Sequence, residues 1–142
     1  MRKLGIKIKL DSDTMKFMSL FENITKANAT DCFKQGERIV FIVNKGKAGP
    51  AVGKGGGNIR RLEMLLKKKI KVVEHDPDLI EFVKNVIHPL QAKEISENEG
   101  IVTIAPADSV TRGYLIGRGA VNLRQFEEIV KRYFDIKELR VV

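Results

Sequence analysis

Apolar and polar residues change their spacing several times along the first half of the chain, and each spacing predicts a different element. Alternation over 6–10 predicts a strand, whereas apolar residues three or four apart over 17–24 predict an amphipathic helix. Two strand-like runs follow at 30–34 and 38–44, with a glycine-containing turn between them. A glycine-rich stretch, a second amphipathic helix and a strand over 70–74 complete this half.

The second half shows the same succession of patterns. In order, the predicted elements are a helix over 79–87, strands over 92–97 and 101–105, a short helix ending at Tyr114, a glycine turn, a helix over 123–133 and a strand over 136–142. Asp76 is a candidate N-cap for the first of these helices, and Asp108 or Ser109 for the short one. We predict an α+β fold built twice, with domains at 1–75 and 76–142.

An internal repeat supports this duplication. With an offset of 64 residues, 52–60 aligns with 116–124, and both segments contain a Gly-basic-Gly element followed by Asn-apolar-Arg. The match continues downstream, where Glu63 aligns with Glu127. One offset shared by separate identical elements indicates a duplicated unit of about 65 to 70 residues.

Composition restricts the class of protein. The chain has 142 residues, of which 43% are hydrophobic, enough for a packed core. Its one cysteine, Cys32, can form neither an internal disulfide nor a zinc site. The longest apolar runs fall far short of the roughly 20 residues that span a membrane, and the N-terminus carries no apolar signal segment. We expect a soluble, cytoplasmic protein without a membrane partner.

Positive charge is concentrated in one window. The formal net charge is +8, and residues 44–71 hold nine basic side chains against the single acid Glu63, whereas the charges elsewhere cancel. The nine are Lys45, Lys47, Lys54, Arg60, Arg61, Lys67, Lys68, Lys69 and Lys71. This segregation favours a phosphate backbone as the partner, through counterion release, although a lysine-rich solvated helix would have the same composition.

The two glycine turns have the chemistry of a phosphate-binding loop. Glycine permits positive φ and lets a ligand backbone approach without a β-carbon in the way. The N–H groups at the start of the following helix attract anions, and Lys54 or Arg118 adds a cation at the tip. A nucleotide-hydrolysing P-loop is excluded because Ala48 stands where that motif needs Gly, and Gly55 stands where it needs Ser or Thr. A dinucleotide-binding motif is excluded because Asn58 stands where it needs Gly.

No arrangement typical of catalysis is found. Cys32 lies in a predicted strand, where a buried structural thiol is expected rather than a nucleophile. His75 and His88 flank one predicted helix and are too far apart for a metal pair. We therefore predict no enzyme, no metal site and no cofactor. The seven Phe and two Tyr residues are mostly expected in the core, so no broad aromatic stacking platform is predicted.

A family resemblance is carried by the segment Gly53-Lys54-Gly55-Gly56, preceded by Ala51-Val52 and followed by Asn58-Ile59-Arg60, which resembles the GXXG loop of KH domains. The order of elements resembles the type II (prokaryotic) KH fold, α-β-β-α-α-β, in which helices cover one face of a three-stranded sheet. Two such domains in tandem resemble the KH pair of the NusA transcription factors, and the compact form resembles the archaeal NusA-like family.

The resemblance implies single-stranded RNA as the ligand, with the loop against its backbone and bases along the adjoining helix and strand. The implied contacts are Gly53, Lys54, Gly55, Gly56, Asn58 and Arg60 in the first domain and Gly117, Arg118, Gly119, Asn122 and Arg124 in the second. Arg61, close to the loop and off the apolar face, is a further candidate. Ala120 replaces the fourth glycine, and because alanine can adopt helical φ/ψ we expect the turn to survive with weaker RNA binding. Candidate groove walls, with core packing as the alternative, are Val52, Ile59, Ile70 and Val72.

We predict a NusA-like protein that binds single-stranded RNA, such as a nascent transcript, and acts in transcription elongation, termination or antitermination. Two alternatives remain open. One is a ribosome-associated or RNA-processing protein that recognises structured RNA such as ribosomal RNA. The other is a module whose basic face docks an acidic protein such as RNA polymerase, independently of the glycine loops. No small-molecule substrate is expected.

Overall fold

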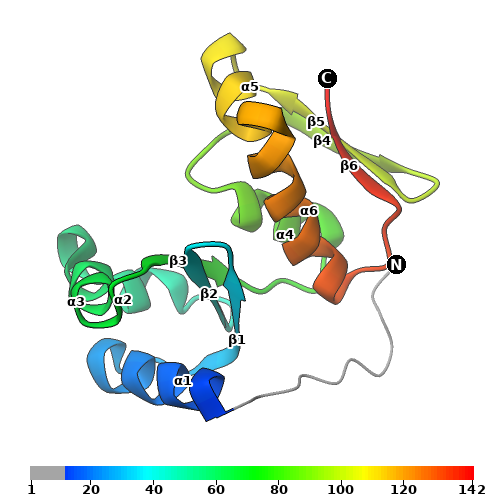
Figure 1. The fold of residues 1–142 in the computed structure, drawn as a ribbon. Helices are drawn as coiled ribbons and strands as arrows, with labels where there is room; N and C mark the ends of the chain where they lie inside the picture. Colours follow the sequence, from blue (N-terminus) through cyan, green and yellow to red (C-terminus); the bar gives the residue numbers. More distant parts are fainter. Residues whose placement is uncertain (1–11) are drawn as a thin grey trace. The chain divides into compact units, whose positions relative to one another are not determined.

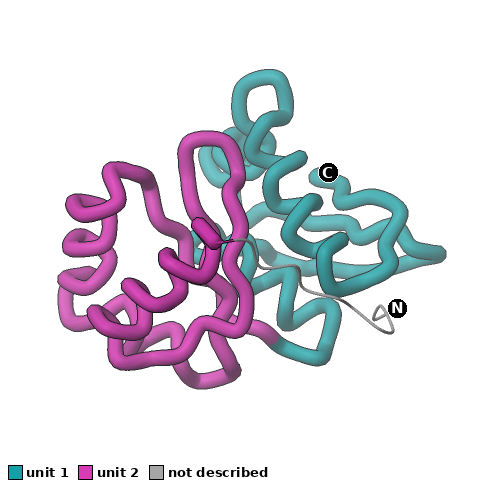
Figure 2. The backbone as a smooth tube through the Cα atoms, turned by 60° about the horizontal axis from the view of Figure 1, so that its bottom comes forward, with its two compact units in different colours: residues 1–6, 76–142 teal, residues 7–75 magenta. Residues whose placement is uncertain are grey.

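The computed structural model describes residues 12–142, which form two compact units divided between His75 and Asp76 (Figure 2). In chain order, the first unit is the magenta part of Figure 2 and the second is the teal part. The first unit contains α1 (Ser12–Thr25), β1 (Ala29–Gln35), β2 (Arg38–Val43), α2 (Ala48–Val52), the 3₁₀ turn η1 (Lys54–Gly56), α3 (Gly57–Leu66) and β3 (Lys69–Glu74) (Figure 1). The second contains α4 (Leu79–Ile87), β4 (Ala92–Asn98), β5 (Ile101–Pro106), α5 (Ser109–Ile116), η2 (Arg118–Ala120), α6 (Val121–Tyr133) and β6 (Glu138–Val141). The predicted α+β class is confirmed, whereas the predicted strand over 6–10 lies outside the described residues.

Each unit has one three-stranded sheet, and the two sheets share a topology. The strand orders are β1-β2-β3 and β4-β5-β6. In each sheet the first two strands are antiparallel and the last two are parallel. Parallel neighbours need a long crossover connection, and in both units it consists of two helices with the glycine turn between them. The glycine turn is therefore held at both ends by regular structure.

The core of the first unit lies between its sheet and its three helices. Phe41 and Val43 of β2 point to one face of the sheet, where Phe21 of α1 stacks on Phe41 with ring centroids 4.4 Å apart. Ala51 of α2 and Leu62 of α3 are fully buried in the same cluster. Both helices that flank the first glycine turn are thus anchored in the core, which fixes the position of the turn.

The second unit anchors its turn in the same way. Leu115 of α5 and Leu123 of α6 are buried on either side of the turn. The centre of this core is aromatic, because the ring of Phe82 in α4 lies 5.5 Å from those of Tyr133 and Phe134. Such aromatic pairs add stability beyond the area they bury.

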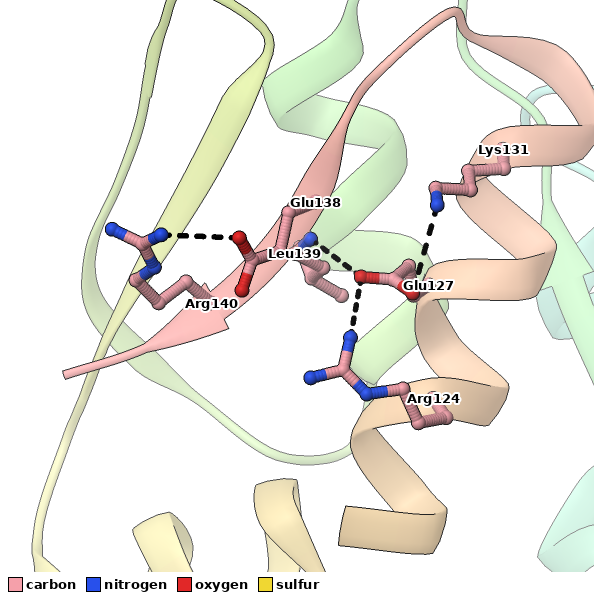
Figure 3. A network of polar contacts seen from close by, with 6 residues as sticks. All are labelled: Arg124, Glu127, Lys131, Glu138, Leu139 and Arg140. Carbon is pink, nitrogen blue, oxygen red and sulfur yellow. Dashed lines mark hydrogen bonds and ion pairs between the residues drawn. The ribbon is translucent and has the colours of Figure 1, made fainter.

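A glutamate ties the last helix of each unit to the last strand. Glu127 of α6 is buried, and its Oε2 accepts the Leu139 N–H of β6 at 2.9 Å and an Arg124 N–H at 2.8 Å (Figure 3). The repeat-related Glu63 of α3 accepts the Ile70 N–H of β3 at 3.1 Å. The repeat identified in the sequence thus reproduces one specific contact in both units.

The helix starts differ from the prediction in one place. Asp78, rather than Asp76, caps α4, and it accepts the Glu81 N–H at 3.0 Å. Asp76 is buried and accepts the Asp78 N–H at 2.8 Å, so it shapes the turn before the helix. Asp108 caps α5 by accepting the Thr111 N–H at 2.7 Å, and this hydrogen bond lowers the pKa of its carboxyl.

Candidate nucleic-acid interface

The first glycine loop is a tight turn between α2 and α3. Gly53 has φ +81° and ψ +169°, and its N–H donates to the Gly49 carbonyl at 3.1 Å. Gly55 and Gly56 follow in left-handed conformation, with φ +60° and +73°. The Gly56 N–H closes the turn by donating to the Gly53 carbonyl at 3.1 Å. Lys54 and Gly55 are exposed at the tip.

The second loop repeats this backbone geometry. Gly117 has φ +73° and ψ +175°, and Gly119 has φ +63° and ψ +25°. Ala120 has φ +61° and ψ +22°, so the expectation that it would adopt right-handed helical angles is wrong. The physical reason is that the fourth loop residue is the N-cap of α6 and the helix begins only at Val121. An alanine here carries the strain of a left-handed backbone.

An asparagine packs over the first glycine of each loop. A β-carbon at Gly53 would lie 2.9 Å from the Asn58 side chain, whose Nδ2 donates to the Pro50 carbonyl at 3.4 Å. At the second loop a β-carbon on Gly117 would lie 2.7 Å from the Asn122 side chain, whose Nδ2 donates to a carbonyl of α5 at 2.8 Å. The structure therefore gives both asparagines, predicted as RNA contacts, a role in shaping the loop.

Two of the predicted arginine contacts have partners within the protein. The guanidinium of Arg60 donates to the Gly55 carbonyl, which braces the first loop from its own helix. Arg124 forms an ion pair with Glu127 at 2.8 Å while half of its side chain stays exposed. Both arginines are thus oriented before any ligand binds.

Three predicted contacts are exposed cations. Lys54 and Arg118 occupy equivalent positions at the two loop tips, and Arg61 lies on the exposed side of α3. Within residues 12–142 none of these three side chains forms a hydrogen bond or an ion pair. Their charges are available to an external anion such as a phosphate.

The two units differ in net charge, because the basic window lies in the first one. Residues 12–75 contain 13 basic and six acidic side chains, whereas 76–142 contain nine basic and 11 acidic ones. Not every lysine in the window is a free surface charge. Lys68 lies 3.6 Å from a carboxylate oxygen of Glu37. Lys71 is half-buried, and burial together with the charge of Arg38 lowers its pKa to about 8.

A polar cavity opens beside α2. It has a volume of about 340 Å³, and its lining includes Lys26, Asn28, Asn44, Lys47 and Pro50. Two ammonium groups and two amides suit a phosphate or the polar edge of a base. Of these residues only Lys47 is among the nine basic side chains of the window identified in the sequence. The others converge because the segments after α1 and after β2 meet at one end of the sheet.

The apolar candidates for groove walls belong mainly to the core. Ile59, Ile70 and Val72 pack against the core cluster of the first unit, as the alternative proposed. Among the aromatic residues Tyr133 is buried, as expected, but Tyr114 is 62% exposed. Tyr114 was not among the contacts predicted from the sequence, because its short helix offers too few turns to reveal an inner face.

No cluster of three or more His, Cys, Asp or Glu side chains suited to a metal ion occurs in 12–142. Over the same residues, no helix has both the length and the apolar character needed to cross a bilayer.

Comparison with known proteins identifies the family. Residues 18–99, more than half of the chain, match the KH domain family. A protein of Halobacterium salinarum is 30% identical over 136 residues, which cover 94% of this chain and 98% of the relative. One of Methanococcus vannielii is 31% identical over 140 residues, covering 96% and 81%. Both bear the name "Probable transcription termination protein NusA".

A solved structure agrees in fold. The crystal structure of APE1850 matches with a TM-score of 0.75 and 28% identity, covering 94% of this chain and all of that one. The family match includes the first glycine loop and ends before the second, which is related to the first by the internal repeat. On these grounds the chain belongs to the KH domain family and, within it, to the archaeal NusA-like proteins.

Proposed function

We propose that this chain binds single-stranded RNA through two type II KH domains, residues 1–75 and 76–142, and acts as a NusA-like transcription factor. The observation that carries the proposal is the duplicated loop, which has the same backbone angles in both units and an exposed cation at each tip. Membership of the KH family supports the RNA ligand. The name of the relatives supports a role in transcription termination.

In this proposal the first loop holds the sugar-phosphate backbone. A β-carbon added at Gly55 would meet nothing within 4 Å, so the space above the tip is open to a ligand. Lys54 neutralises a phosphate there, and Arg61 continues the positive track one helical turn into α3. Asn58 and Arg60 act indirectly, by holding the loop in the shape that the backbone of the ligand meets.

The first domain supplies most of the affinity that depends on charge. Phosphate contacts release counterions, so the first domain, whose residues 12–75 have an excess of seven basic side chains, gains most from them. The second domain has an excess of two acidic residues, so its loop acts with a single well-placed cation, Arg118. Contacts to phosphates position the RNA and carry no sequence information themselves.

The test is fluorescence anisotropy with a short unpaired RNA, the matching duplex and the matching DNA, over a range of salt concentrations. Lys54→Asp is expected to weaken unpaired-RNA binding by at least about tenfold and to flatten its salt dependence, with a smaller effect from Arg118→Asp. Lys16→Asp, the same charge change on the exposed side of α1, serves as the control and should bind nearly as well as the unaltered protein. Equal loss in the loop variants and the control would reject the loops as the binding site. A preference for the duplex would favour the ribosomal or RNA-processing alternative.

One observation favours a second candidate, the docking of an acidic protein. Met64 and Leu65 are 77% and 58% exposed on α3, and Arg61 lies one turn before them on the same helix. An apolar pair beside a cation is typical of protein interfaces. If it docks a protein such as RNA polymerase, Met64→Asp should abolish an association that survives nuclease treatment while leaving RNA affinity unchanged.

A further inference from the structure

Exposed apolar side chains occur in the helices on either side of the second glycine loop. Tyr114 and Val110 of α5 are 62% and 67% exposed, and they lie four residues apart on one face of the helix. Val121, the first residue of α6 after the loop, is 50% exposed. The loop therefore has an aromatic and aliphatic surface in the helix before it and an aliphatic residue directly after it.

The first loop has no such surface. With the offset of 64 residues, the positions that correspond to Val110, Tyr114 and Val121 are Gly46, Pro50 and Gly57. None of these three has an aromatic ring or a long aliphatic side chain. The two loops share a backbone but differ in what stands beside it.

Net charge does not favour the binding of a nucleic acid at the second loop. Residues 76–142, which contain this loop, have nine basic and 11 acidic side chains, and Arg118 is the cation at the loop tip. A nucleic acid held here needs a contact that does not depend on net charge. Base stacking on an aromatic ring is such a contact, and it tolerates any sequence because every base has a π-face.

We propose that Tyr114 stacks on an unpaired nucleobase of the RNA strand whose phosphate meets Arg118, with Val110 flanking the base. This inference rests on the proposed function and adds a contact to it. Tyr114 is held in place through its backbone, because Asn122 Nδ2 donates to its carbonyl at 2.8 Å. A helical side chain leans toward the N-terminus of its helix, so the ring lies over the turn that contains Val110 rather than over the loop. The nucleotide beside the one at Arg118 is thus the one that stacks.

The protein is suited to a direct optical test. It has no tryptophan and two tyrosines, and the second tyrosine, Tyr133, is buried against Phe82. Stacking of a base on Tyr114 quenches its fluorescence, whereas the buried Tyr133 is out of reach of a ligand. The variant Tyr133→Phe leaves Tyr114 as the single tyrosine, and its fluorescence then reports on this site alone.

The experiment titrates the full chain with an unpaired oligoadenylate, and separately with an oligonucleotide of equal length and charge that lacks bases. We expect quenching in the unaltered protein and in Tyr133→Phe with the first probe only. Tyr114→Ala should lose about tenfold in affinity with an unchanged salt slope, and Tyr114→Phe should keep the affinity. These results support the inference.

Other outcomes overturn it in distinguishable ways. Normal RNA affinity of Tyr114→Ala together with unquenched Tyr114 fluorescence would overturn the stacking contact, leave the proposed function standing and mark the surface as one for a protein. Equal quenching by the baseless strand would assign the signal to phosphate contact. Absence of RNA binding by the unaltered protein would overturn the proposed function itself.

Discussion

The fourth residue of each glycine loop has a left-handed backbone, so substitutions between alanine and glycine there should change stability in a known direction. Ala120 and Gly56 have nearly the same angles, φ +61° and +73°, but only the alanine carries a β-carbon. Ala120→Gly should therefore stabilise the chain, and Gly56→Ala should destabilise it. Gly57, the next residue, has right-handed angles, φ −59° and ψ −41°. Gly57→Ala should consequently stabilise α3.

The magnitudes follow from opposing terms. A left-handed L-residue costs about 1–2 kcal/mol, whereas the greater freedom of glycine in the unfolded chain costs about 0.5–1 kcal/mol. The difference predicts that Ala120→Gly raises the free energy of unfolding by about 0.5–1 kcal/mol and that Gly56→Ala lowers it by a similar amount. A β-carbon at Gly56 would lie 3.5 Å from Arg60 Nη1, an ordinary contact, so no clash adds to the cost. Gly57→Ala should gain about 0.5–1 kcal/mol from helix propensity.

The assay is urea unfolding followed by two signals. Both tyrosines lie in residues 76–142, so tyrosine fluorescence reports on the second unit, while far-ultraviolet circular dichroism reports on the whole chain. Ala120→Gly should move the fluorescence midpoint upward, and Gly56→Ala should move the dichroism midpoint downward. The reasoning is refuted if Ala120→Gly is destabilising, or if Gly56→Ala and Gly57→Ala, which add the same methyl group one residue apart, change stability with the same sign.

Two further predictions concern buried charged groups. Glu127→Ala leaves the Leu139 N–H without its acceptor and should lower the free energy of unfolding, measured with urea, by about 1–3 kcal/mol. Glu128→Ala, at the exposed neighbouring position, should lower it little, and equal losses would contradict the role of the buried carboxylate. Burial and the charge of Arg38 lower the pKa of Lys71 from 10.5 to about 8 in the folded chain, so the unfolded chain binds more protons between those two pH values. The free energy of unfolding should therefore rise with pH across that range, by up to about 3 kcal/mol. Lys71→Met should remove most of the rise, and an identical pH profile in that variant would exclude Lys71 as its source.

The sequence predicted the repeated order of helices and strands because that order follows from local patterns. Apolar periodicity fixes the inner faces of long elements such as α6, and the glycines mark the turn. The sequence could not predict the left-handed backbone of Ala120, since alanine itself prefers right-handed angles. Left-handed angles are imposed only by the loop, which is closed by the hydrogen bond from the Ala120 N–H to the Gly117 carbonyl. Nor could it predict that Asn58 braces a glycine, because that contact spans two helices whose packing is set by the core.

The exposure of side chains on short helices could not be predicted from the sequence either. In the eight residues of α5 only Leu115 is buried, so periodicity has little to act on, and no pattern separated Tyr114 from the aromatic residues, most of which were expected in the core. The pairing of Arg124 with Glu127 has a similar cause. Their spacing of three residues permits the contact, but the burial that gives it weight comes from β6, which follows in the chain.

The duplicated scaffold and its differing surfaces together determine how RNA affinity should respond to salt. Both loops have the same angles and the same bracing asparagine, so the scaffold presents two equivalent backbones to a ligand. Within residues 12–142 the excess of basic residues is confined to the first unit, so the dependence of binding on salt should count mainly the phosphates held there. Stacking on Tyr114 contributes affinity that salt does not remove. A chain altered at Lys54 should therefore retain, at high salt, a larger fraction of its binding than the same chain altered at Tyr114.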